Sequence, residues 1–233
     1  MDERSASGPE SEREAAERAR PKAVKAPRLP KAFDTDALPA GRLEDFEAYS
    51  SLQLANADFA GQEVRRLTIE TARLSGVSLA GARLQLSQIR DTRLDRCDLS
   101  SAEWFQCDVR RVELRDCRAL GFAAVEAKVQ DLLLADCNIQ LANFRFSTVE
   151  RARFERCDLS SAEFTSARLT DVVFAGCDLR NADFSGATLT RVDLRGAQID
   201  GMRAGFAELR GALLTPPQAL ALVRQSGIIV EWE

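Results

Sequence analysis

The stretch DRCDLSSAEW (residues 95–104) recurs almost letter for letter as ERCDLSSAEF (residues 155–164), with cysteine in the same place. Both copies belong to a longer pattern, in which a large apolar side chain stands at every fifth position from residue 54 to residue 199. Of these 30 positions, 28 carry a large apolar residue. A period of five fits neither a helix nor a strand, and over this length it indicates a repeat architecture.

A second column lies two residues before each of these positions. It holds twelve Ala, six Cys and four Val, so 22 of its 30 members are small or compact. The segment CRALGFAA (residues 117–124) departs from the pattern, because Phe122 takes a small position while Ala119 and Ala124 take large ones. The exchange roughly conserves core volume, so we expect an irregular coil that stays in register.

The units resemble the pentapeptide repeat, whose pattern is Ala, then Asp or Asn, then Leu or Phe, then two variable residues. Examples are ADFAG, ARLQL, CDLSS, AEFTS, CDLRN, ADFSG and VDLRG. The resemblance covers residues 52–214. It implies an all-β fold, a right-handed quadrilateral β-helix solenoid with four pentapeptides and twenty residues per coil. Residues 46–214 would then form a rod of about eight coils, in which each coil packs only on its neighbours.

The cysteines independently support a coil of twenty residues. Five of them are spaced by twenty, and Cys107 lies half a turn away; the five are Cys97, Cys117, Cys137, Cys157 and Cys177. Inward cysteine behaves as a small apolar residue. Adjacent rungs are close enough for a disulfide, but five stacked thiols cannot all pair. A single ladder also does not converge on a metal ion. We therefore predict free thiols, no metal site and no cofactor.

The composition argues against an enzyme. The chain of 233 residues has no histidine, which removes the commonest general base and metal ligand. No GxxxxGK[ST] or GxGxxG phosphate loop is present. Carboxylates are expected on a regular convex surface, not in a cleft that would separate their pKa values. The sequence predicts a non-enzymatic protein without catalytic residues.

Charge and hydropathy bear on location. The net charge of −4 differs from the basic excess of a typical nucleic-acid binder. No apolar run reaches the length of a membrane span, and the charged N-terminus lacks the apolar core of a signal peptide. We predict a cytoplasmic protein whose rod binds neither membrane nor nucleic acid directly.

Residues 1–45 are predicted to form a disordered, charged and proline-containing tail. Its segment RARPKAVKAPRLPK (residues 18–31) has six basic residues, no acidic residue and three prolines. Such a segment is extended. It could contact nucleic acid or an acidic partner surface, or serve only as a solvated linker.

Residues 215–233 are predicted to close the rod. A helix can begin at Pro216 or Pro217 and end near Gly227, followed by a short strand in IIVEW (residues 228–232). The segment has more apolar surface than a short helix needs, so it either caps the last coil or forms a homodimer contact. The candidate residues are Leu220, Leu222, Val223, Ile228, Ile229 and Trp232.

Function is therefore expected on the outer surface, where two stripes stand out. The acidic stripe, in which Arg118 and Arg180 are the only basic members, consists of Asp58, Asp98, Asp158, Asp178 and Asp200. The apolar stripe, a candidate partner site, consists of Leu86, Phe105, Val125 and Phe146.

We favour a protein-interaction rod whose partner is unidentified. The alternative comes from the resemblance, since the unbroken frame is similar to loop-free members such as the mycobacterial fluoroquinolone-resistance and Qnr-type proteins. These mimic duplex DNA, bind DNA gyrase or topoisomerase IV and give resistance to fluoroquinolones. Against it, residues 51–233 carry 23 basic and 25 acidic side chains, which is nearly neutral. The aspartates could also serve turn chemistry.

Overall fold

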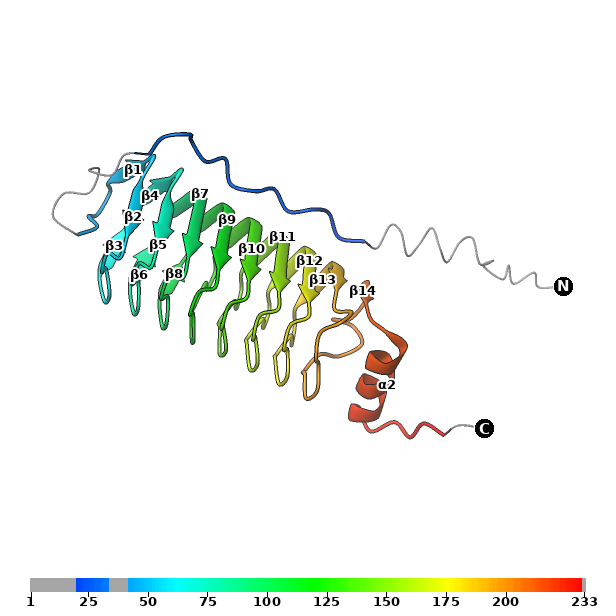
Figure 1. Ribbon diagram of the computed structural model, residues 1–233. Helices are drawn as coiled ribbons and strands as arrows, with labels where there is room; N and C mark the ends of the chain where they lie inside the picture. The colour runs from blue at the N-terminus through cyan, green and yellow to red at the C-terminus, as the bar shows by residue number, and fades with distance from the viewer. Residues whose placement is uncertain (1–19, 34–41, 232–233) are drawn as a thin grey trace.

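The computed structural model describes residues 20–33 and 42–231. Short parallel strands stack into a β-solenoid of about eight turns (Figure 1), as the sequence predicts. The strands are β1 (Ala48–Ser50), β2 (Gln53–Ala55), β3 (Glu63–Arg65), β4 (Thr68–Glu70), β5 (Arg73–Ser75), β6 (Arg83–Gln85), β7 (Gln88–Asp95), β8 (Glu103–Phe105), β9 (Asp108–Arg115), β10 (Lys128–Ala135), β11 (Thr148–Glu155), β12 (Arg168–Ala175), β13 (Thr188–Asp193) and β14 (Ala212–Leu213).

The pairing register confirms the coil length. Each strand residue pairs with the residue twenty positions later, as Val109 does with Val129 and Val129 with Val149. The corners explain the period of five, because every fifth residue from 51 to 201 has a positive φ, between 47° and 82°. A left-handed L-residue costs about 1 kcal/mol or more. Hydrogen bonds between coils offset this cost, as when the corner N–H of Ser51 donates to the Glu70 carbonyl at 3.1 Å.

The core is apolar, and its aromatic rings stack from coil to coil. Phe164 lies between Phe144 and Phe184, with ring centroids 5.2 Å and 4.7 Å away. On the opposite side Phe154 stacks on Phe174 at 5.0 Å. All five rings are fully buried. Like residues stack on like in adjacent coils, which explains why the same letters recur every twenty residues.

The irregular coil stays in register, as predicted. Phe122 is buried, and its ring meets Trp104 edge-on at 5.1 Å, which fills the space that Ala119 and Ala124 leave. Bridges continue through this coil from Glu103 to residue 123 and on to residue 143. All six cysteines are buried free thiols.

The helix α2 (Pro216–Gln225) lies at the C-terminal end of the rod (Figure 1). Thr215 caps it in a capping box with Gln218, and the Gln218 amide donates to the carbonyls of Leu194 and Ala197 at 2.8 Å and 2.9 Å. The helix therefore covers open carbonyls of the last full coil. The predicted strand is wrong for residues 228–231, which form no strand. A strand needs a neighbouring strand edge for hydrogen bonding, and residues 228–231 lie beyond α2, away from the edge of the last coil (Figure 1).

Residues 20–33 differ from the predicted disordered tail. They run in an extended conformation along the outside of the coils, from the C-terminal end of the rod towards β1 (Figure 1). We call them the strap. Residues 1–19 and 34–41 lie outside the described part of the chain. The strap differs from the prediction because the rod supplies hydrogen-bond acceptors that composition does not reveal.

Candidate interaction surfaces

The interior of the described rod holds the six thiols. No three His, Cys, Asp or Glu side chains in ranges 20–33 and 42–231 are placed to share a metal ion. The thiols point at backbone oxygens, as Cys117 Sγ does at the Arg115 carbonyl, 3.3 Å away. Burial raises the pKa of Cys107 to about 11, so this thiol is protonated at neutral pH. Across the same ranges, no helix has the length and apolar character to cross a membrane.

The acidic stripe is a row of turn residues. Four members share one column, and Asp200 lies two positions beyond it. Each of the four carboxylates accepts a hydrogen bond from the backbone N–H two residues later, at 2.9–3.0 Å; they are Asp58, Asp98, Asp158 and Asp178. Asp178 also pairs with Arg180 at 2.6 Å, and this hydrogen bond lowers the pKa of Asp178. The carboxylates thus stabilise the turns of their own face.

The apolar stripe occupies two adjacent columns. Leu86 and Phe146 stand at left-handed corners and are 48% and 50% exposed. Phe105 on β8, 37% exposed, and the half-buried Val125 stand in the neighbouring column, one coil apart. Leu141, which the sequence did not single out, is 59% exposed.

A shallow hollow lies between the side chains of this region. Phe105, Val125 and Leu141 line it together with Gly121 and Ala123 of the irregular coil. Small residues there leave the surface lower than the coils on either side.

The C-terminal candidates divide into two groups. Leu222 is buried against the rod, and Leu220 and Val223 are half-buried. Ile228 and Ile229 are 48% and 86% exposed. Trp232 lies outside the described residues. Capping thus employs Leu222, while the exposed isoleucines contribute nothing to it.

The strap is held by three regularly spaced hydrogen bonds. The backbone N–H groups of Lys22, Lys25 and Arg28 donate to Oδ1 of an aspartate at 3.1 Å, 3.1 Å and 2.8 Å. The acceptors, which we call the Asp ladder, are Asp171, Asp131 and Asp91 in the same order. Donors three residues apart therefore meet acceptors forty residues apart.

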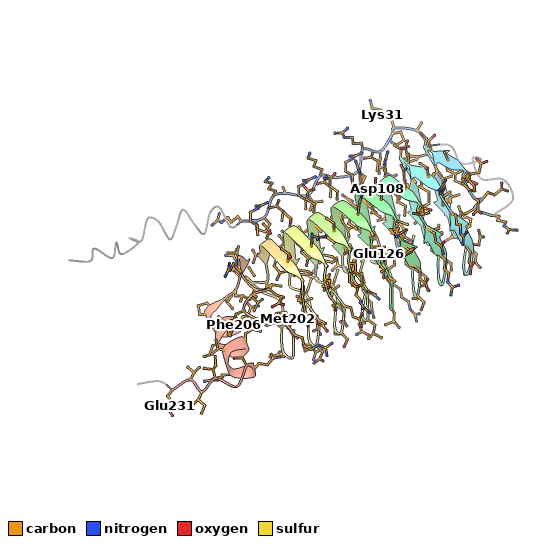
Figure 2. All side chains as sticks on the ribbon, turned by 180° about the vertical axis from the view of Figure 1, so that it is seen from behind. Lys31, Asp108, Glu126, Met202, Phe206 and Glu231 are labelled. Carbon is orange, nitrogen blue, oxygen red and sulfur yellow. The ribbon has the colours of Figure 1, made fainter. Side chains whose placement is uncertain are left out.

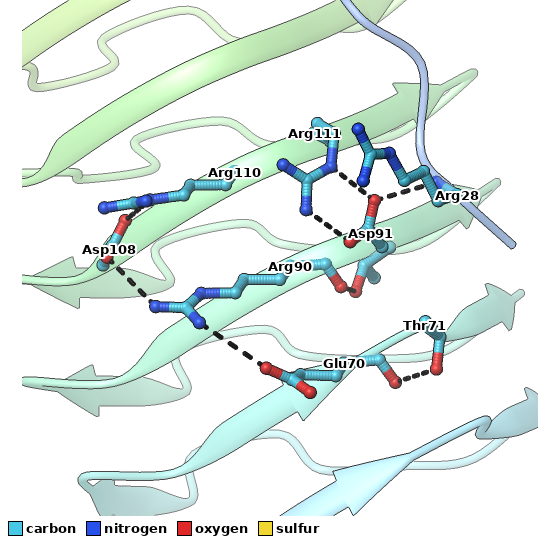
Figure 3. A network of polar contacts seen from close by, with 9 residues as sticks. Arg28, Glu70, Thr71, Arg90, Asp91, Asp108, Arg110 and Arg111 are labelled. Carbon is cyan, nitrogen blue, oxygen red and sulfur yellow. Dashed lines mark hydrogen bonds and ion pairs between the residues drawn. The ribbon is translucent and has the colours of Figure 1, made fainter.

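Each carboxylate of the Asp ladder is also clamped by an arginine from the next coil. Figure 3 shows Arg111 donating through Nε and Nη2 to the two oxygens of Asp91, both at 2.6 Å, while the Arg28 N–H approaches from the strap. The same bidentate pairs join Arg151 to Asp131 and Arg191 to Asp171. Such pairs fix the carboxylate geometry.

These contacts shift the ladder carboxyls. The Arg191 hydrogen bond lowers the pKa of Asp171 below its ordinary value. For Asp91 and Asp131 burial acts to raise the pKa, but the arginine hydrogen bond and the strap N–H outweigh it, so both are lowered. Asp131 and Asp171 are only 2% and 1% exposed. All three are held ionised beneath the strap.

The sequence carried a signal for this site. The strap repeats in units of three, as Pro21-Lys22-Ala23, Val24-Lys25-Ala26 and Pro27-Arg28-Leu29. The corner column alternates Asp and Arg with a period of forty, as Asp91, Arg111, Asp131, Arg151, Asp171 and Arg191. A comparison of the three-residue period of the strap with the forty-residue period of the corner column would have predicted that the two segments are in contact.

The repeat frame now identifies the family. The family model described as Pentapeptide repeat region matches residues 87–164 and 147–216, together more than half of the chain. The chain belongs to the pentapeptide-repeat family. No curated protein matches this pentapeptide-repeat chain.

Several solved structures are similar to this pentapeptide-repeat protein at low identity. A trypsin-treated variant of QnrB1, a plasmid-mediated fluoroquinolone resistance protein, is 22% identical over 81% of this chain and 99% of its own, with a TM-score of 0.47. HetL, involved in heterocyst differentiation regulation in the cyanobacterium Nostoc, is 18% identical over 73% and 90%, with a TM-score of 0.29. A pentapeptide-repeat protein of the Arabidopsis thaliana thylakoid lumen is 28% identical over 37% and 68%, with a TM-score of 0.31.

Proposed function

We propose that the chain is a non-enzymatic protein-interaction rod whose partner contacts the apolar stripe. The observation that carries this proposal is the apolar stripe, in which Leu86, Phe105 and Phe146 are 37–50% exposed. Leu141, 59% exposed, stands at the other corner of the same side. Apolar side chains exposed in contiguous rows mark partner sites more often than isolated ones do. The hollow between Phe105 and Leu141 gives a partner side chain a place to insert.

The test is affinity capture from the source cell with two matched variants. Phe105→Glu with Phe146→Glu places charges in the stripe, while Phe206→Glu changes another exposed phenylalanine, 59% exposed, three coils away. We expect one protein to be lost from the stripe variant and retained by the Phe206 variant. A set of captured proteins that is identical for all three chains would contradict the proposal.

DNA mimicry is the second candidate, and the column on the rod that holds Asp58, Asp98, Asp158 and Asp178 favours it, although Arg118 interrupts this column. DNA-binding grooves recognise regularly spaced phosphates. However, each of these carboxylates already accepts a turn N–H, and Arg180 neutralises Asp178. Supercoiling by DNA gyrase, with and without a fluoroquinolone, decides the matter. Inhibition or relief of drug-induced cleavage near equimolar protein supports mimicry, and no effect at large excess excludes it.

The C-terminal end is our candidate for self-association, because Ile228 and Ile229 lie exposed beyond α2. The mass in solution of the chain and of its Ile228→Asp/Ile229→Asp variant tests this. A dimer that the variant reduces to a monomer supports the contact. A wild-type chain that stays monomeric at all concentrations excludes this contact.

A further inference from the structure

We propose that the Asp ladder is a binding site for basic polyproline II peptides, and that the strap is its resident, displaceable ligand. The site is separate from the proposed partner surface. Phe146 of the apolar stripe and Arg151, which clamps Asp131, stand at successive corners, so one side of the rod separates the two surfaces. The inference therefore stands whether or not a partner binds the stripe.

The spacing of the two elements is the first argument. Three residues of polyproline II advance by about 9.3 Å, and two coils of a β-solenoid rise by about 9.6 Å. Every third strap residue thus faces every second coil. The corner column offers a carboxylate at that interval and no other, because Arg111 and Arg151 occupy the coils between.

The chemistry of each strap position is the second argument. Pro21, Val24, Pro27 and Pro30 are half-buried and face the rod, where no N–H is required. The residue that follows each of the first three is basic, donates its N–H to the Asp ladder and keeps its side chain exposed. The next position is Ala or Leu. The strap therefore repeats an apolar residue, a basic residue and then Ala or Leu.

The rod surface beneath the strap repeats in the same way. Leu133 and Val173 are forty residues apart and line the hollow between the strap and the coils, together with Val24. Glu113 and Arg153 alternate with them. Leu133 and Val173 thus lie in the coils of Asp131 and Asp171, whereas Arg93 takes the same place in the coil of Asp91.

The strap is held weakly enough to detach. None of residues 20–33 is fully buried, and its hydrogen bonds to the ladder are the three backbone bonds already described. At its end, Arg73 lies over the Phe33 ring at 5.1 Å, and Lys31 projects away from the coils (Figure 2). Segments with few buried contacts open at low free energy. Another peptide of the same chemistry can therefore compete for the ladder.

Hydrogen exchange on the full chain tests the cis contact. We expect slow exchange at the amides of Lys22, Lys25 and Arg28 and fast exchange at Ala23 and Ala26. Changing the three basic residues to proline removes the donors and keeps the polyproline II backbone, so it should release the strap. Changing them to alanine removes the charges and keeps the donors, so exchange should be faster than in the wild type and slower than in the proline variant. Equal exchange at all strap amides of the wild type would overturn the proposal.

A labelled peptide of residues 20–33 tests the site in trans. It should bind the full chain that carries the three prolines, and not the wild type, because the tethered strap competes at about millimolar effective concentration. Each donor that is changed to proline in the peptide should weaken binding about tenfold. Absence of binding to the released chain, or equal binding to both chains, would overturn the proposal.

The ladder itself has a matched control. Asp136 is clamped by Arg156 through the same bidentate geometry, at 2.7 Å and 2.6 Å, but contacts no part of the strap. In the released chain, Asp131→Ala should weaken peptide binding by at least about tenfold, and Asp136→Ala should leave it unchanged. Thermal melting of both variants is the control that they are folded. Equal losses would mean that the peptide binds elsewhere.

Discussion

The acidic stripe and the Asp ladder are both columns of aspartates on the same rod, yet their carboxylates have different partners. In the stripe, Asp58 and Asp98 accept an N–H two residues away, within one turn. In the ladder, Asp131 accepts from Arg151 one coil away and from Lys25, 106 residues away. The stripe residues are exposed or half-buried, whereas Asp131 is 2% exposed. A count of charges along a face cannot separate local turn chemistry from long-range recognition.

The largest difference is expected when a carboxylate of each column is removed. Asp131→Ala leaves Arg151 without its bidentate partner and the strap without an acceptor, and should lower the free energy of unfolding by about 3 kcal/mol. Asp98→Ala removes one turn hydrogen bond and should lower it by about 1 kcal/mol. Urea denaturation of the two variants measures both values. Equal losses of unfolding free energy would show that the acidic stripe and the Asp ladder contribute to stability in the same way.

Acid should weaken the ladder. The pKa values of Asp91, Asp131 and Asp171 are lowered in the folded protein. Their stabilisation is therefore complete above about pH 3.9, the ordinary carboxyl value. It is lost as the pH falls through the lower folded values. The unfolding free energies of the wild type and an Asp91→Asn/Asp131→Asn/Asp171→Asn variant should differ by a constant amount above that pH and converge below it. A difference that grows in acid would contradict this assignment.

The smallest effect is expected for a conservative change in the stripe. Asn138 stands in the same column and accepts the Gln140 N–H at 3.3 Å, so an amide oxygen can replace the carboxylate. Asp98→Asn should change the free energy of unfolding by less than about 0.5 kcal/mol. A loss as large as that of Asp131→Ala would show that the stripe carries a charge-dependent contact.

The sequence predicts those features that depend on the residues of a single repeat column. The coil length, the inward cysteines, the exchange at Phe122 and the helix start near Pro216 all follow from residue size at fixed spacing. The strand at residues 228–231 was wrong because β-propensity does not supply a pairing edge.

The strap was missed for a different reason. Lysine and proline in residues 20–33 suggest disorder because such segments cannot form a core of their own. Polyproline II has no internal hydrogen bonds, so its N–H groups are free for outside acceptors. Only a comparison of the strap period with the spacing of Asp91, Asp131 and Asp171 would have predicted their contact. The sequence analysis instead singled out the aspartates of the acidic stripe.

Repeat proteins lengthen by duplicating whole units, and the strap restricts which duplications are tolerated here. A single added coil between Asp91 and Asp131 would separate them by about 14 Å, which is no multiple of the strap's three-residue advance of about 9.3 Å. Two added coils restore the match if the strap gains three residues. Descendants of this gene that keep the strap should therefore differ in length by forty residues in the rod and three in the strap.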